Sequence, residues 1–475
     1  MTPPSTLRVG TRPRTENRRC GGIGLRLAES CLPRDIAANI AGLLGFVPFM
    51  ADDSTMRFPA LRPAVRTTAV AALASATCLG LVMPASAADP ETYPVPADGV
   101  FQMTGSGWGH GRGMSQWGAY QAASEGRTHQ EILSFYYPGT TLATLPSGVV
   151  RVLLSSDTGR NLVVRAVPGL SATFDQDGNQ TLVLPAQPEG CTRPATKWRA
   201  RSVGKRMRLD ARCGTWTKVA RKLGPTVSFE VPEGIVATTS RRSKRGYRGA
   251  VSATYVASRS VRVVNTVTME QYLRSVVAAE VSPSWPAESL RAQAVAARSY
   301  AATEMRGRAA SAFDVYDWVR SQAYPGAVEY GSGWRVTRSR EHPATDAAIA
   351  ATAGVHVIAG GVPALTQFSS SNGGATAASP LPHMVAAADP WDAAATKNPR
   401  LAWTDTVSAG QLSAQCSGSG PVTAVRVLQR EGAGPWGGRV SRLEIVGTNR
   451  SCQLTSDSAI RLALGVNSSF LTFTS

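Results

Sequence analysis

Short runs of β-forming residues between turn signals constrain the fold of this 475-residue chain most strongly. Turn-forming residues lie at 157–159 (Asp-Thr-Gly) and 177–179 (Asp-Gly-Asn). Runs of this length that are rich in Val, Leu and Thr and flanked by such turns are typical of a β-meander. The three runs of the meander are expected at 149–154, 162–167 and 181–184. One further strand is expected at 261–266, and strands with loops are expected at 354–373 and again after 416.

Helices are expected between these strands. The apolar spacing predicts helices near 115–124, 129–136, 269–281, 286–305 and 459–464. The fold class is therefore α+β: a β-rich single catalytic-type domain with a few short helices, preceded by a signal peptide. The expected divisions are an extension at 1–55 that is disordered or non-native, a signal peptide at 56–87, a linker at 88–100, and a domain at 101–475. Within that domain we expect a Gly-His segment at 101–145, a basic β-rich insertion at 146–250 and a core at 251–475.

An export signal is expected at 56–87. Arg57, Arg62 and Arg66 precede an uncharged run at 67–83, and the small residues Ala85-Ser86-Ala87 follow it. A basic, then apolar, then small-residue order is what the export machinery reads, so the chain is expected to be secreted. The alternative is a membrane anchor, but an anchor needs about 20 strongly apolar residues, and this run is shorter and rich in Ala and Thr.

Four cysteines remain after removal of the expected signal. Because exported proteins meet an oxidising environment, Cys191–Cys213 and Cys416–Cys452 are the natural disulfides. The alternatives are free thiols or a zinc site, and no C-x-x-C or clustered His supports zinc. We therefore predict no metal and no cofactor.

The positive charge is concentrated in one segment. After the signal the chain has 40 Lys and Arg against 27 Asp and Glu, and residues 186–248 alone hold 16 against 4. A basic exported surface suggests anionic partners, such as wall polymers or phospholipid headgroups, while export argues against nucleic acid. The alternative is a solubilising face without a dedicated partner.

The helix expected at 269–281 ends in a carboxylate. Leu273, Val276, Val277 and Glu280 follow the i, i+3, i+4, i+7 spacing of one helix face. Partial burial and the negative end of the helix dipole both disfavour a charged carboxylate, so the pKa of Glu280 is expected to be raised, as a general acid requires. The alternative is that Glu280 turns to solvent or pairs with an arginine.

A glycine-rich segment covers residues 105–119 and reads GSGWGHGRGMSQWGA. Alternating glycine allows close approach of backbone to a ligand. Trp108, His110, Gln116 and Trp117 supply hydrogen bonds and flat apolar faces of the kind that bind sugars. The pattern is neither a P-loop nor a dinucleotide motif.

Several of these segments resemble the SpoIID/LytB family. The segment VAAEVSPSWPAESLRAQAVAARSYA at 277–301 looks like its core motif, and GSGWGHGRGMSQWGA with ILSFYYPGT at 132–140 resembles a second hallmark. SQAYPG at 321–326, FSSSNGGAT at 368–376 and the tail IRLALGVNSSFLTF resemble further family segments.

The resemblance implies a wall-associated protein that acts on peptidoglycan glycan strands. Sporulation members are lytic transglycosylases, and Glu280 matches their catalytic glutamate. The positions that line the family's substrate groove are matched here by Arg291, Arg298, Ser370, Ser371 and Asn372. The implied mechanism uses one carboxyl, which first protonates the glycosidic oxygen and then deprotonates the muramic-acid 6-hydroxyl.

Two alternatives remain beside this reading. A hydrolase normally needs a second carboxylate, for which Asp314 or Asp317 are candidates. The family's other branch, the amidase enhancers, implies a wall-binding modulator that stimulates a partner amidase. The sequence also departs from the sporulation enzymes in placing its Gly-His motif before the glutamate motif and Val281 after Glu280, where Met is usual.

Overall fold

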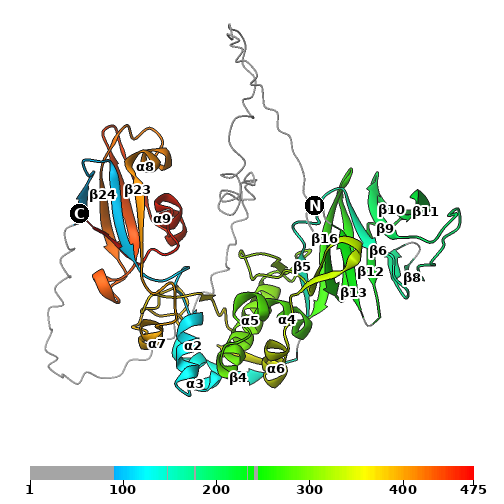
Figure 1. Cartoon of the computed structure of the whole chain (residues 1–475), viewed down its shortest axis with the longest axis horizontal. Helices are drawn as coiled ribbons and strands as arrows, with labels where there is room; N and C mark the ends of the chain where they lie inside the picture. The colour runs from blue at the N-terminus through cyan, green and yellow to red at the C-terminus, as the bar shows by residue number, and fades with distance from the viewer. Residues whose placement is uncertain (1–89, 147, 176–177, 233, 240–243, 475) are drawn as a thin grey trace, which may run out of the picture. The chain divides into compact units, whose positions relative to one another are not determined.

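The computed structural model describes residues 90–474, except 147, 176–177, 233 and 240–243 (Figure 1). The expected extension at 1–55 and the expected signal peptide at 56–87 lie outside the described residues. The described part is β-rich with several helices, which confirms the expected α+β class. No helix in this part is long and apolar enough to span a membrane.

A seven-stranded sheet carries the first expected run. Its strand order is β17-β5-β16-β15-β12-β7-β8, and only the β17–β5 pair is parallel. The bounds are β5 (Val149–Leu153), β7 (Ser171–Asp175), β8 (Asn179–Val183), β12 (Thr226–Glu230), β15 (Ala250–Ala257), β16 (Ser260–Thr268) and β17 (Val315–Tyr316).

An eight-stranded sheet holds most of the basic segment, in the order β11-β10-β9-β6-β13-β14-β18-β19. The bounds are β6 (Asn161–Arg165), β9 (Lys197–Val203), β10 (Arg206–Cys213), β11 (Thr215–Leu223), β13 (Ile235–Thr239), β14 (Lys244–Arg248), β18 (Val328–Tyr330) and β19 (Val336–Ser339). The expected single meander is therefore wrong, because β6 belongs to this sheet while β5 and β8 belong to the other.

The two sheets share one hydrophobic core. Val152 of β5 and Val263 of β16 are fully buried in the same cluster as Val164 of β6 and Trp198 of β9. Residues on β9 alternate between buried and partly exposed, as expected for a strand with one face on a core. The opposite face of the eight-stranded sheet is the one that carries the charged residues of β9.

Six α-helices alternate with the strands along the described part of the chain from 116 to 394. Their bounds are α2 (Gln116–Ser124), α3 (His129–Tyr136), α4 (Met269–Glu280), α5 (Ala287–Gly307), α6 (Pro343–Ala351) and α7 (Pro390–Ala394). Short strands accompany them: β3 (Met114–Ser115) with β22 (Phe368–Ser369), and β4 (Thr141–Thr144) with β20 (Val355–Ala359) and β21 (Val362–Pro363). Leu290, Ala294 and Ala297 lie on one side of α5 and are buried.

The C-terminal strands form two further sheets around a separate cluster of buried residues. The first has β1 (Glu91–Pro94), β24 (Val422–Arg430), β25 (Val440–Gly447) and β26 (Ser451–Leu454), and the second has β2 (Val100–Gly105), β23 (Trp403–Ser408) and β27 (Leu471–Thr474). Helices α8 (Ala409–Gln415) and α9 (Asp457–Leu464) cover them. The expected linker at 88–100 is wrong over 91–94, since these residues form β1 and pair with β24.

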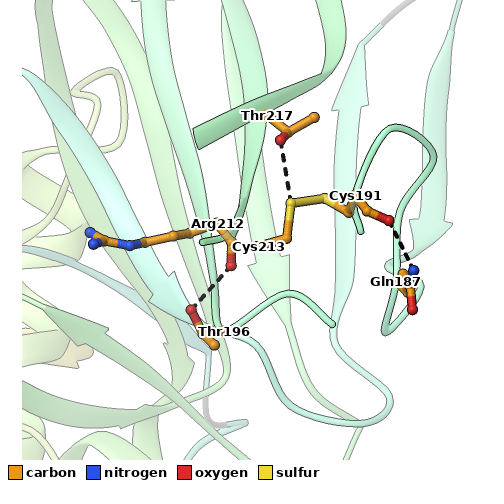
Figure 2. Close-up of a disulfide and its surroundings, with 6 residues drawn as sticks. All are labelled: Gln187, Cys191, Thr196, Arg212, Cys213 and Thr217. Atoms are coloured by element: carbon orange, nitrogen blue, oxygen red, sulfur yellow. Dashed lines mark hydrogen bonds between the residues drawn. A yellow bond between two sulfur atoms is a disulfide. The ribbon is translucent and has the colours of Figure 1, made fainter. Parts of the chain in front are cut away.

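Both expected disulfides are present. Cys191 and Cys213 have Cα atoms 5.7 Å apart, and Cys416 and Cys452 have Cα atoms 5.8 Å apart. Figure 2 shows the first bond, with Thr217 Oγ1 3.3 Å from Cys213 Sγ. The bond ties the loop before β9 to the end of β10, which fixes one edge of the basic sheet.

Candidate functional site

Helix α4 presents Glu280 at its last residue. Thr268 caps the helix by accepting a hydrogen bond from the Gln271 amide, and the chain turns sharply after Val281. Leu273, Val276 and Val277 are buried in the core, which holds the helix and therefore the position of its final carboxylate. The structure thus places Glu280 where the apolar spacing indicates.

The Glu280 carboxyl lies in a partly buried position with few compensating contacts. Its Oε1 accepts a 2.9 Å hydrogen bond from the Ala323 amide, in the segment SQAYPG. Burial raises the pKa of Glu280, and this amide together with the Gln116 side chain opposes part of the rise. The balance favours a carboxyl that stays protonated at higher pH than an exposed glutamate, as a general acid needs.

Gln116 brings the glycine-rich segment to the same carboxyl. It is the first residue of α2, which Ser115 caps through a 3.1 Å hydrogen bond from Gly118 N. Gln116 is buried beside Glu280, although its Nε2 makes no hydrogen bond of ordinary geometry. The Gln116 amide therefore has a free donor next to the carboxyl.

Three aromatic rings from the same two segments form a cluster, with Trp117 directly after Gln116 and Trp285 five residues after Glu280. The rings of Trp117 and Trp285 have centroids 4.8 Å apart, and Tyr120 lies 5.3 Å from Trp117 and 5.2 Å from Trp285. All three are partly exposed. Flat rings with a wet edge offer a stacking surface for sugars. Trp285 and Tyr120 were not among the predicted site residues, and the SPSW turn directly after Glu280 is the signal that points to Trp285.

A cavity of about 630 Å³ opens beside the end of α4. Its lining includes Ala279, Pro283 and Ala323, the neighbours of Glu280, and also the exposed Trp318. Its charged lining residues are Arg245, Asp317, Arg338, Arg340, Glu341 and His342. A cavity of this size suits a sugar unit with its substituents.

The two carboxylates considered as partners of Glu280 differ in their surroundings. Asp314 is buried and paired with Arg151 at 2.5 Å, so it is committed to structure. Asp317 lines the cavity, and burial raises its pKa, while hydrogen bonds from Ser155 act in the opposite direction. Of the two candidates, Asp317 is therefore the one that lines the cavity beside the end of α4.

The glycine-rich segment packs against FSSSNGGAT. Trp108 and Ser371 exchange backbone hydrogen bonds of 2.8 and 3.2 Å, and Trp117 N donates to Ser370 O at 3.1 Å. Gly107 has a φ of 82°, and a Cβ there would lie 2.9 Å from Ser371 O. The glycine spacing therefore permits close approach of two protein segments, whereas the sequence indicated a ligand.

Ser371 and Asn372 face inward. Both are fully buried, and they donate to Asp392 and Asp389 at 2.8 and 2.6 Å. Their expected role in lining a groove is contradicted here, because neither side chain reaches solvent. Ser370 is partly exposed. The buried pair Asp389 and Asp392, the N-cap and an internal residue of α7, was missed, since helix α7 itself was not predicted.

The two arginines of α5 also differ from expectation. Arg298 is fully buried, pairs with Glu270 at 2.6 Å and donates to Val355 O at 3.2 Å. A groove-lining role for Arg298 is therefore contradicted. Arg291 is partly exposed and pairs with Glu288, which also accepts a 2.8 Å hydrogen bond from His129 N.

His110 lies in a different environment from Glu280. Its Nδ1 accepts a 3.0 Å hydrogen bond from Arg112 N, which places the proton of the neutral ring on Nε2. Burial and the charge of Arg112 lower its pKa to about 4. The other charges that act on it are Asp457, Arg439 and Arg461 of the C-terminal region. Trp108 stacks under Arg400, whose guanidinium carbon lies 3.7 Å from the centroid of the Trp108 ring.

The four cysteines weighed above as possible zinc ligands carry no free thiol in this structure. The four cysteines at 191, 213, 416 and 452 are taken up in disulfides. Across the described residues, no three His, Cys, Asp or Glu side chains come together as metal ligands.

The fold and site define a β-rich α+β protein in which separate sequence motifs meet around one glutamate. The family model described as "SpoIID: Stage II sporulation protein" matches residues 257–358, which include Glu280. The amidase enhancer of Bacillus subtilis (strain 168) is 52% identical over 44 residues, or 9% of this chain and 6% of that protein. An uncharacterized protein of Brachyspira hyodysenteriae is 45% identical over 65 residues, or 14% of this chain and 18% of that protein.

Both findings support a relation to the SpoIID/LytB family, and the family model matches the segment 257–358. The matched segments cover less than a fifth of either relative, so the likeness concerns this core segment. No solved structure matches the chain.

Proposed function

We propose that this chain is an exported, wall-associated lytic transglycosylase that cleaves peptidoglycan glycan strands at muramic acid. The relation to this family supports a role in peptidoglycan processing. The observation that carries the finer proposal is Glu280: one partly buried carboxyl with a raised pKa, at the end of a helix whose last turn lines a cavity.

In this proposal Glu280 acts twice. The protonated carboxyl donates its proton to the glycosidic oxygen as the bond to the anomeric carbon breaks. The resulting carboxylate then accepts the proton of the muramic-acid 6-hydroxyl, whose oxygen bonds to the anomeric carbon. The product is a 1,6-anhydro sugar, no water is consumed, and the carboxyl ends protonated again.

The surroundings of Glu280 suit both half-steps. The Ala323 amide and the free Gln116 donor stabilise the carboxylate that forms after the first proton transfer. Trp117, Tyr120 and Trp285 offer stacking surfaces for neighbouring sugars. The cavity beside α4 has room for the substituents of the muramic acid.

A second candidate is a modulator without catalysis of its own. Its support is the likeness to a protein named amidase enhancer. In that case the chain binds wall glycan and raises the rate of a partner amidase, and Glu280 serves binding or structure.

Mass spectrometry of soluble products separates the two. The purified chain is incubated with intact and with amidase-treated peptidoglycan, beside Glu280→Gln. The transglycosylase hypothesis predicts products that are lighter by one water than hydrolysed glycans. Their rate of formation should be lower in Glu280→Gln by roughly 10²–10⁴-fold. The modulator is supported if neither substrate yields a product and an amidase releases stem peptides faster in the presence of the chain than in its absence.

A further inference from the structure

The outer face of the eight-stranded sheet carries positive charges in register. Arg212 of β10 lies directly opposite Lys197 of β9, and Lys197 lies opposite Arg165 of β6. Arg208 of β10 and Arg201 of β9 form a second like-charged pair. Directly opposed like charges destabilise a sheet, so the row of Arg212, Lys197 and Arg165 has a cost that packing within the chain does not explain.

The charges point to the same side, away from the core. Trp198, Ala200 and Ala211, which alternate with them along the strands, are buried in the shared core. Figure 2 shows the Arg212 side chain extending away from Cys213 and its disulfide. On this side Arg212 is exposed, and Lys197 and Arg165 are partly exposed.

Internal acids neutralise only part of this charge. Asp210 is fully buried and takes three guanidinium groups, Arg199 and Arg208 at 2.6 Å and Arg201 at 3.2 Å. One carboxylate for three arginines leaves an excess of positive charge. Within the described ranges, Arg165, Lys197 and Arg212 form no ion pair. The pKa of Lys197 is lowered by burial and by the charges of Arg212 and Lys244.

One tryptophan lies at each end of the row formed by Arg212, Lys197 and Arg165. Arg212 lies over Trp216 with its guanidinium carbon 5.9 Å from the ring centroid, and Arg165 lies over Trp334 at 5.1 Å. Both rings are partly buried under cations. Tryptophans that insert into a membrane interface protrude instead, so the arrangement favours a soluble polymer over a lipid surface.

Hollows on the same sheet provide room for anionic groups. One of about 270 Å³ is lined by Arg160, Asn161, Arg199, Arg201, Ser202 and Arg259. A second of about 540 Å³, at the β10–β11 side, has six Lys and Arg side chains in its lining and no carboxylate.

We infer that this face is a binding site for a linear phosphate-bearing wall polymer, laid across β10, β9 and β6 between Trp216 and Trp334. Arginine forks match phosphate oxygens in two parallel hydrogen bonds, and a chain of phosphates can follow a row of cations across adjacent strands. The site is independent of Glu280 and would hold the protein on the wall whether or not it cleaves glycan.

The test measures binding of linear inorganic polyphosphate to the full chain at several salt concentrations. The variant Arg165→Gln/Lys197→Gln/Arg212→Gln removes three charges of the row and leaves Asp210 and its partners in place. The matched control, Arg306→Gln/Arg442→Gln/Arg450→Gln, removes three exposed charges elsewhere. The row variant is expected to bind at least about tenfold more weakly, with a salt slope shallower by roughly two to three.

A melting measurement guards against a folding defect. Without ligand the row variant should be as stable as the wild type or more so, because like-charge repulsion is relieved. Equal weakening in the control variant, unchanged binding in the row variant, or binding to phosphatidylglycerol vesicles but not to polyphosphate would each overturn the inference. Cleavage of short soluble glycans should be the same in all three proteins, which separates this result from the fate of the proposed catalysis.

Discussion

The Ala323 amide donates a 2.9 Å hydrogen bond to Glu280 Oε1, and so joins the segment SQAYPG to the end of α4. Gln116 approaches the same carboxyl from the glycine-rich segment. The Gly-His motif precedes the glutamate motif in this chain, yet the fold brings Gln116 to Glu280. The altered order is therefore compatible with one site.

Replacing Gln116 should move the alkaline limb of the activity profile. Gln116 lowers the pKa of Glu280, so Gln116→Leu should raise that pKa further and let activity persist to higher pH. The maximal rate should fall, because the carboxylate loses a neighbouring donor. The measurement is the rate of anhydro-product release against pH. Gln121→Leu, on the same helix, serves as the control, and an unmoved limb in Gln116→Leu would show that Gln116 does not act on the titrating group.

Ser371→Ala should affect stability and not glycan binding. The Ser371 hydroxyl is fully buried and donates to Asp392 at 2.8 Å, so its loss should cost about 1–3 kcal/mol of unfolding free energy. Urea unfolding and glycan co-sedimentation measure the two effects. Ser370→Ala, at a partly exposed position, should change stability little. Normal stability with weak glycan binding in Ser371→Ala would return this residue to the groove.

His110 should make the protein less stable in mild acid. Its folded pKa is about 4, below the ordinary 6.5, because burial and Arg112 disfavour the charged ring. The folded state thus binds fewer protons than the unfolded state, and stability present above pH 6.5 is lost as the pH falls toward 4. His110→Asn retains a side-chain acceptor and should reduce this loss by about 2 kcal/mol, measured by urea unfolding at a series of pH values. An identical pH dependence in both proteins would contradict it.

The sequence predicted local elements better than their partners. The limits of α3 and α4 follow from capping residues and apolar spacing, which are local properties. The assignment of β6 to the second sheet was not predictable, since alternation along one strand does not say which strand lies beside it. The helix α6 was missed, although Pro343 at its first turn is a recognised start signal.

The candidate site divides in the same way. Glu280 was predicted because a carboxylate interrupts an apolar stripe, a conflict visible in the sequence. Arg298 was expected in the groove only through the family resemblance, and its burial depends on Glu270 of another helix, a contact that the sequence does not show. Ser371 and Asn372 were also expected in the groove through the resemblance, and the carboxylates that they contact, Asp392 of α7 and its N-cap Asp389, lie about twenty residues further along the chain.

The most direct test of the central claim is the reaction in water labelled with heavy oxygen. A transglycosylase uses the 6-hydroxyl of its own substrate, so the account predicts 1,6-anhydro products whose mass shows no label, formed by the wild type and not by Glu280→Gln. Products whose reducing ends carry the label would show that water is the nucleophile. Glu280 would then share its task with a second carboxylate, and the single-carboxyl mechanism would be wrong.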